Sequence, residues 1–469
     1  MASITQSQYN VSKQPFRNRS VRVNLLNFDF QTISAFEGNL IEGNLTSDST
    51  SNMRNTCDLT LVVTDSSFNI QAEGKIWLDR LVQIYIGVDD IHLGETAWTN
   101  KGIFIINQPT YEYNAATKTL QFQAIDMFGL LTGLRNGYLT DDYTIPQGSN
   151  VRQVIIAILG QNKMNRYLVS ECANTDGSIQ AVPYDMKYTA GQAWSDVLAD
   201  LQDILPNYQM YFDVDGIFHY EAIPYKANEP IRMDDDIWKE NVISETISYD
   251  FESIKNSVKV LGRTHDISHY PSNISVSGAN INLTIASVSG LSQYLLIGFT
   301  LTSNINGNIN LQVNSFGLHP LVNERNNYIT SLSANTYYVA QWNGNSWLFL
   351  GHLQAQGEFK DNDANSPFFV GASAGEIKIV LSGDDYSNIT SDALAQERAK
   401  WEVYQRCRMN DTVNITTVPI YWSEVNWMVA YTPLGGNSPS QYLIKSISTN
   451  LAVDGTQTYT LAKFYPYYY

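Results

Sequence analysis

The chain has 469 residues, of which 43 % are apolar and 16 % are charged, and its formal net charge is −17 at pH 7. The length allows about three domains, and so much apolar content with so little charge excludes a disordered chain. Lys and Arg form no cluster, which argues against binding nucleic acid through its phosphates. The net negative charge has two possible roles: it keeps the protein soluble, or it lines a surface that repels DNA.

The three cysteines, Cys57, Cys172 and Cys407, lie far apart and form no CxxC or Cys/His pattern. This spacing excludes a disulfide-stapled scaffold and predicts reduced, mostly buried thiols. The first twenty residues lack an apolar core segment, so we expect no signal peptide. We also expect no membrane span, because no run reaches about 18 apolar residues.

Residues 1–130 are predicted to form a first all-β domain. Short runs with alternating apolar residues are separated by turn residues, as in strands that bury one face. Strands at this spacing indicate a barrel or a compact sandwich, since closure removes sticky edges. The runs are VRVNLLNFDF, CDLTLVVTD, FNIQAEGKIWL, RLVQIYIGV, KGIFIINQPTYEY and KTLQFQAID.

Residues 131–225 change to a helical period and are predicted to form an α+β domain. Ser149 and Asn150 offer a cap for a helix that carries apolar residues on one stripe. Thr189 and Gln192 have capping-box spacing, so we expect a second helix to begin at Thr189. Asp213-Val-Asp215-Gly216 lacks the ligands of a calcium loop and reads as a hairpin turn.

Residues 226–268 and 381–469 return mainly to strands and are predicted to form a second, split β domain. A helix is expected from Ser391 to Arg408, packed against this domain, and aromatic-rich strands follow it. The intervening residues 269–380 are rich in Asn and Gly and poor in charge. They are predicted to be a small β-sandwich inserted through a loop, where extra domains are well tolerated.

The sequence predicts no catalytic residue, no metal site and no cofactor. It has no GxSxG, SxxK or phosphate-cradling glycine motif, so an enzyme is not expected. His265 and His269 are four residues apart, but they lie in a predicted loop without the Glu of an HExxH motif. The acidic run Asp234–Asp236 is expected to be a solvated or channel-facing loop.

Three aromatic residues of the insertion are the predicted ligand-binding residues. Tyr337, Trp342 and Trp347 flank the Asn343-Gly344-Asn345 turn. Aromatic faces beside Asn side chains are suited to stacking on sugar rings. The alternative is that both tryptophans pack in the core of the sandwich.

Two stretches resemble the tail hub, or tail-tip and baseplate hub, family of long-tailed bacteriophages. They are GIFIINQPTYEYNAATKTLQFQAIDMFGLL and the segment from Ser391 to the last strand. The phrases NGNINLQVNSFGLHPLV and YYVAQWNGNSWLFLG resemble modules of phage tail fibres and baseplates. The resemblance implies a mainly β fold with an α+β subdomain. It assigns 1–130 and the split 226–268 and 381–469 to two β-barrel hub domains, and 269–380 to an inserted β-sandwich.

The same resemblance implies a structural virion protein at the tail tip, assembled in the host cytoplasm. The expected assembly is a homotrimeric ring that joins a hexameric distal tail or tail tube protein and encloses the DNA channel. Other expected partners are the tape-measure protein and tail-tip or fibre proteins, while DNA passes through without specific binding. The alternative function is a carbohydrate-binding adhesin that recognises a host-surface glycan through the insertion.

Overall fold

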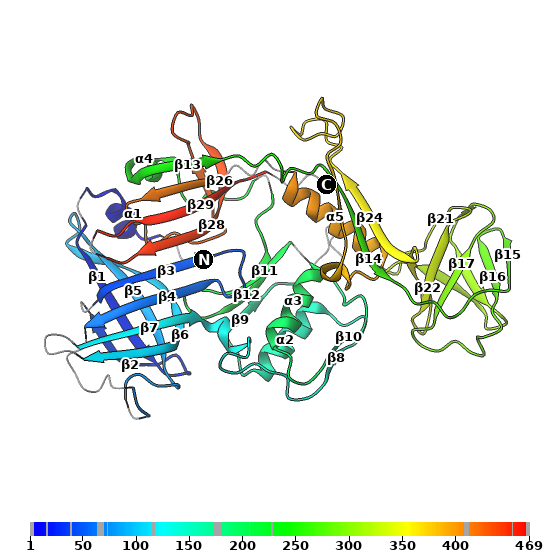
Figure 1. Ribbon diagram of the computed structural model, residues 1–469, viewed down its shortest axis with the longest axis horizontal. Helices are drawn as coiled ribbons and strands as arrows, with labels where there is room; N and C mark the ends of the chain where they lie inside the picture. Colours follow the sequence, from blue (N-terminus) through cyan, green and yellow to red (C-terminus); the bar gives the residue numbers. More distant parts are fainter. Residues whose placement is uncertain are drawn as a thin grey trace.

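The computed structural model describes residues 4–15, 17–37, 40–62, 70–72, 74–113, 118–172, 180–205, 207–226, 228–407, 412–452 and 454–465. Figure 1 shows an elongated molecule with a large sheet at one end and a small β-sandwich at the other. Helices α2, α3 and α5 lie between them. The predicted fold class, mainly β with an α+β subdomain, is confirmed.

Twelve of the described strands form one sheet, in the order β13-β26-β29-β28-β3-β4-β7-β6-β5-β1-β2, with β27 paired to β28. Strands from both ends of the chain meet where β28 pairs antiparallel with β3, from Ser446 opposite Asp48 to Asn450 opposite Asn44. The strands are β1 (Arg19–Leu26), β2 (Thr32–Glu37), β3 (Leu40–Asp48), β4 (Asn55–Val62), β5 (Leu81–Asp90), β6 (Glu95–Tyr113), β7 (Lys118–Asp126), β13 (Val242–Ser248), β26 (Thr412–Thr417), β27 (Met428–Tyr431), β28 (Ser440–Asn450) and β29 (Gln457–Lys463).

Alternation in the sequence explains which face of this sheet is buried. Leu59 of β4 lies opposite Phe122 of β7, and both side chains are almost fully buried. Their neighbours in sequence point to the other face, as the two-residue repeat of a strand requires. Strands β2 and β3 were not expected. The predicted strand FNIQAEGKIWL is wrong, because its described residues contain only an isolated bridge between Ile70 and Ile76; its other residues lie outside the described part.

The α+β unit packs two helices, α2 (Val151–Gln161) and α3 (Trp194–Ile204), with small sheets. The predicted cap of α2 is confirmed, since the Asn150 side chain accepts a hydrogen bond from the backbone N–H of Gln153 at 3.0 Å. The turn at Gly216, with φ +71°, closes the expected hairpin. The strands are β8 (Tyr143–Ile145), β9 (Tyr167–Val169), β10 (Met186–Tyr188), β11 (Tyr208–Phe212) and β12 (Phe218–Ala222), after the 3-10 helix η2 (Met127–Leu130).

The second helix begins five residues later than predicted. Thr189 does bond to Gln192, because its backbone N–H donates to Gln192 Oε1 at 2.7 Å, but this contact closes a turn before the helix. Helix α3 starts at Trp194, and Asp196 Oδ2 accepts from the backbone N–H of Ala193 at 3.4 Å. The capping-box spacing therefore marked a turn, which uses the same side-chain chemistry as a cap.

A small three-stranded sheet connects the helical part of the molecule to the sandwich. Helix α5 (Asp392–Arg406), capped by Ser391, packs on the sheet β24-β14-β25, at the centre of Figure 1. This sheet, rather than β26–β29, receives the apolar side of the helix. Arg408, the expected last residue of the helix, lies outside the described residues. The strands are β14 (Ser257–Thr264), β24 (Gln354–Lys360) and β25 (Lys378–Leu381), and η3 (Asp384–Tyr386) precedes the helix.

The sandwich has its own core, which contains Trp342 and Trp347. Seven strands form the sheet β15-β16-β19-β20-β23-β22-β17, and β18 pairs with β21. The strands are β15 (Asn273–Ser277), β16 (Asn280–Thr284), β17 (Leu296–Thr300), β18 (Ile305–Asn306), β19 (Asn310–Val313), β20 (Leu318–Val322), β21 (Ser331–Leu332), β22 (Tyr337–Trp342) and β23 (Trp347–Gly351). The predicted domain boundaries at residues 130, 225, 268 and 380 stay a prediction.

Two short helices lie against the large sheet or its loops, α1 (Gln6–Lys13) and α4 (Asp235–Asn241). The acidic run Asp234–Asp236 is not a loop as expected, because Asp234 occupies the N-cap position and Asp235 and Asp236 lie in the first turn of α4. Negative charge in the first turn suits the positive end of a helix dipole. Cys57 and Cys172 are buried, and none of the three cysteines, all of which the structure describes, forms a disulfide. In the described part of the chain, no helix is long and apolar enough to cross a membrane.

Candidate functional site

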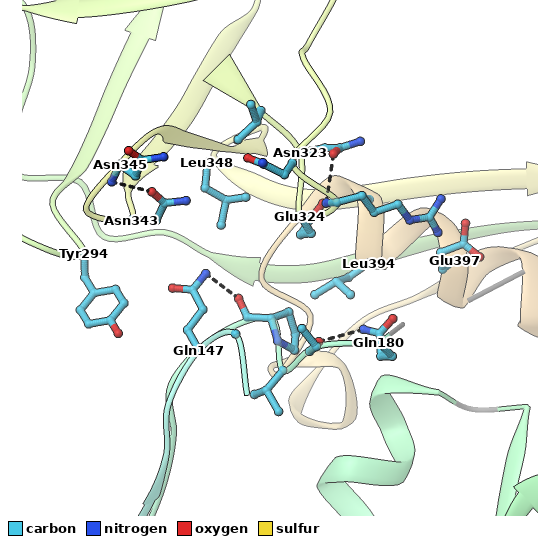
Figure 2. Close-up of a pocket in the computed structure, with 18 of the residues that line it drawn as sticks. Gln147, Gln180, Tyr294, Asn323, Glu324, Asn343, Asn345, Leu348, Leu394 and Glu397 are labelled. Carbon is cyan, nitrogen blue, oxygen red and sulfur yellow. Dashed lines mark hydrogen bonds between the residues drawn. The ribbon is translucent and has the colours of Figure 1, made fainter. Parts of the chain in front are cut away.

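A cleft of about 770 Å³ lies where the α+β unit, the sandwich and α5 meet. Figure 2 shows sandwich residues Asn343, Asn345 and Leu348 on one side and Gln147 and Gln180 of the α+β unit on the other. The first turns of α5, with Leu394 and Glu397, lie at one end. The side-chain amides in the lining are Gln147, Gln180, Gln293, Asn323, Asn326, Asn343, Asn345 and Gln396.

Several of these amides are held in place by local hydrogen bonds. Asn343 Oδ1 accepts from the backbone N–H groups of Asn345 at 3.1 Å and Ser346 at 2.8 Å. Gln147 Nε2 donates to the carbonyl of Pro183 at 3.0 Å, and Gln180 Nε2 donates to that of Ala181 at 3.0 Å. The contacts of Gln147 and Gln180 each use one of the two N–H donors of the amide. Asn343 uses both lone pairs of its oxygen, and its Nδ2 donates to Ser346 Oγ at 3.1 Å.

Tyr294 is the aromatic residue of the cleft, and its backbone is strained. Its φ of +67° lies in the left-handed region, which is unusual for a bulky side chain. Two backbone hydrogen bonds hold this conformation, from Tyr294 N to the Trp342 carbonyl at 2.8 Å and from Trp342 N to the Leu295 carbonyl at 2.9 Å. The side chain is 36 % exposed. Desolvation, followed by the Asp185 carboxylate, raises the pKa of Tyr294.

The charged residues of the cleft are few and of mixed sign. Burial raises the pKa of Glu324, whose carboxylate accepts a hydrogen bond from the Ser391 hydroxyl. Glu397 forms an ion pair with Lys400 at 3.0 Å. Arg325 is the third charged residue of the lining, after Glu324 and Glu397. No group of His, Cys, Asp and Glu that could hold a metal ion occurs among the described residues.

The predicted aromatic residues lie beside this cleft rather than in it. Trp342 and Trp347 face each other across the β22–β23 hairpin, with ring centroids 5.3 Å apart. Their exposed fractions are 6 % and 0 %, and the Trp342 ring also contacts His319 at 4.6 Å. This is the arrangement that the core-packing alternative expects, and sugar stacking by these rings stays a prediction.

Tyr337 does not join the two tryptophans. It lies at the other end of β22, opposite Thr300, and its ring covers Gly298, where an added Cβ would lie 1.7 Å from the phenol oxygen. Burial and the neighbouring Tyr270 raise the pKa of Tyr337 to about 12. The structure therefore brings together two of the three predicted residues, and it separates the third.

A second polar cluster lies between the large sheet and the α+β unit. The buried Arg54 guanidinium stacks on the Tyr211 ring at 3.7 Å and donates to Gln209 Oε1 at 2.7 Å. Asn426, from the loop before β27, donates to the same Gln209 oxygen. Burial raises the pKa of Asp126 in this region to about 6. The cluster ties strands from both ends of the chain to the α+β unit.

Lys101, which lies near this polar cluster, makes the free energy of unfolding depend on pH. Burial lowers the pKa of Lys101 to about 8, an effect that nearby Glu424 partly opposes, and its ammonium donates to the Tyr421 carbonyl at 2.7 Å. Because the folded pKa lies below the ordinary value of 10.5, the unfolded chain binds more protons between these values. The contribution of the buried, neutral Lys101 to the free energy of unfolding is therefore complete above pH 10.5, and it is lost as the pH falls to about 8.

We expect wild type to gain up to about 3 kcal/mol of stability over Lys101→Met between pH 8 and pH 10.5. Urea unfolding of both proteins across this range measures the difference. Lys187→Met, at an exposed lysine of β10, is the matched control and should follow wild type. A constant difference between wild type and Lys101→Met would contradict the shift.

The free edge of the large sheet is the third feature with a potential role. Strand β13 pairs with β26 on one side, and no other described strand pairs with its second side. Large apolar side chains are exposed on and after this strand, with Ile243 at 57 % and Phe251 at 70 %. Unpaired strand edges with exposed apolar residues are sites where another chain can add.

The sequence does not predict the cleft, because its residues come from loops, strand ends and a helix that are far apart in the chain. The sequence indicates only the Asn343-Gly344-Asn345 turn, as a neighbour of the predicted aromatic residues. The run Asn-Glu-Arg-Asn-Asn at 323–327 could have indicated a polar turn. Nothing in the sequence indicates that this turn lies opposite Gln147.

A family model described as a domain of unknown function (DUF5048) matches residues 365–468. No curated protein matches the chain. The 43 kDa tail protein of prophage MuSo2 from Shewanella oneidensis is 11 % identical with a TM-score of 0.50, covering 95 % of this chain and 98 % of that one. The tail protein from Neisseria meningitidis MC58 is 11 % identical with a TM-score of 0.51, covering 94 % and 96 %.

At such low identity this likeness concerns the fold alone. The chain has the fold of these two tail proteins over 95 % and 94 % of its length. The resemblance to phage tail proteins, expected from the sequence, is therefore confirmed for the fold.

Proposed function

We propose that this chain is a structural protein of a phage tail or tail-like particle, the tail-tip or baseplate hub. The likeness to two tail proteins over more than nine-tenths of their lengths supports this proposal. The proposal includes a ring, a DNA channel and several partner proteins.

The proposed assembly is a homotrimeric ring. The large sheet of one subunit ends at β13 on one side and β2 on the other. Three copies that pair β13 of one subunit with β2 of the next would cover every such edge, and cyclic closure leaves none exposed. Within one subunit, the pairing of β28 with β3 already joins C-terminal to N-terminal strands in this manner.

The proposed ring encloses the DNA channel and joins a hexameric distal tail or tail tube protein. The tape-measure protein and other tail-tip or fibre proteins are the further proposed partners, and the proposed location is the virion tail tip. DNA passes without specific binding, because the net charge of −17 disfavours contact with phosphates.

Electron microscopy of the purified chain with two-dimensional averaging tests the ring. Three-fold rings with an open centre are the expected result. Compact monomers at high protein concentration would count against a ring formed by this chain alone. A mixed sample with the tube or distal tail protein would then decide whether that protein is required for closure.

A further inference from the structure

We propose that the cleft between the sandwich, the α+β unit and α5 binds a neutral, hydroxyl-rich oligosaccharide. This inference goes beyond the structural role, because it assigns a ligand to residues that ring formation does not use. The site differs from the predicted one, since Tyr337, Trp342 and Trp347 are absent from its lining. It lies instead on the outer side of the same hairpin turn, at Asn343 and Asn345.

The lining has the chemistry that sugar hydroxyls require. A hydroxyl both donates and accepts, and so does each side-chain amide. Asn345 and Gln147 belong to different units and line opposite sides of the cleft, so a ligand between them would meet amides on both faces. Local hydrogen bonds already fix Gln147, Gln180 and Asn343, which lowers the entropy cost of binding.

Tyr294 supplies the aromatic surface. The left-handed region is unfavourable for a bulky residue, and such strain often occurs at functional sites. Its backbone is held there by the pairing with Trp342, while the side chain stays partly exposed at the cleft. Gln293 donates to the Tyr294 hydroxyl at 3.2 Å and restrains the ring. A fixed, exposed ring beside amides suits the apolar face of a sugar.

The other ligand classes fit less well. A phosphate-bearing ligand would meet Arg325 together with the carboxylates of Glu324 and Glu397, which gives no net positive field. A peptide strand would pair with a sheet edge, whereas most of the lining here comes from loops and the first turns of α5. The volume of about 770 Å³ lies within the range of small-ligand sites, about 300–1,000 Å³.

Binding of neutral hexasaccharides of glucose, galactose, rhamnose and N-acetylglucosamine to the full chain tests this proposal, by glycan array and then by calorimetry. Wild type should bind at least one of them. Tyr294→Ala should weaken binding about 2- to 10-fold, because it removes the aromatic contact. Tyr294→Phe keeps the ring and should bind nearly as wild type.

Single loss of an amide should weaken binding about 2- to 10-fold in Asn345→Ala and in Gln147→Ala, because a neutral hydrogen bond contributes about 0.5–1.5 kcal/mol. Tyr328→Ala is the matched control, since Tyr328 is an exposed tyrosine of the same sandwich outside the lining. It should bind as wild type. Circular dichroism of each variant checks that the fold is intact.

Three results would overturn the proposal. One is no binding to any of the four hexasaccharides. Another is equal binding by wild type and a Tyr294→Ala/Asn345→Ala double variant. The third is capture of a protein, rather than sugar, by a photo-crosslinking residue placed at position 345, since it would assign the cleft to a protein segment. None of these readouts depends on whether the chain forms a ring.

Discussion

A chain carrying both Ile243→Lys and Phe251→Lys is expected to stay monomeric at concentrations where wild type forms three-fold rings. Both side chains are mostly exposed in the single subunit, at 57 % and 70 %, so lysine costs little there. In the proposed ring they are covered, and burying an unpaired ammonium costs several kcal/mol. The apparent dissociation constant should rise at least about 100-fold. Analytical ultracentrifugation measures it, and electron microscopy shows whether rings remain.

The matched control for this double variant is Leu318→Lys. Leu318 is an exposed apolar residue of β20, in the sandwich and away from the large sheet, and its exposed fraction is 45 %. This variant should form rings as wild type does. Rings of the double variant at wild-type concentrations would exclude the β13 edge from the interface. They would leave the rest of the structural proposal in place.

Trp347→Ala is expected to destabilise the sandwich by about 3–5 kcal/mol, the usual cost of removing a buried tryptophan. The side chain is fully buried and packs on Trp342 in the core. Hydrogen exchange of the amides in 273–351 measures the effect locally, which matters in a chain of several units. Amides of β14 and α5 report whether the change spreads beyond the sandwich.

Trp347→Phe is the control for this substitution. It keeps an aromatic ring and removes an indole N–H that has no hydrogen-bond acceptor among the described residues. We expect it to cost far less than the alanine variant. The pair also addresses sugar stacking at this position. If Trp347→Ala lost glycan binding while the sandwich kept its wild-type exchange rates, a binding role would be favoured over core packing.

The sequence predicted those parts of the fold that short-range patterns determine. The cap at Asn150, the turn at Gly216 and the amphipathic helix after Ser391 each depend on residues within a few positions. The same rules failed at Thr189, because a turn and a helix cap use the same contact. Local signals are therefore reliable for the chemistry of a contact and less so for the element in which it occurs.

Local sequence patterns do not predict which strands pair when they are far apart in the chain. Strand β3 contains Gly43, Asn44 and Asp48, residue types that disfavour a strand on their own. It is a strand because β4 and β28 hydrogen-bond to its two edges, and β28 lies about 400 residues later in the chain. The cleft was unpredictable for the same reason. Gln147 and Asn345 become neighbours of one cavity only when three units are packed.

The register of β14 and β24 means that the sandwich is an insertion that could be removed or replaced by another domain. Thr264 and Gln354 are partners in this antiparallel pair, so the chain leaves for the sandwich and returns at adjacent points. A short hairpin could join them without moving either strand or α5. Related chains could thus lose the module, or carry a different one, while the sheet that supports it keeps its geometry. In the proposed particle, variation at this one junction would change the proposed glycan site and leave the strands of the proposed ring interface unchanged.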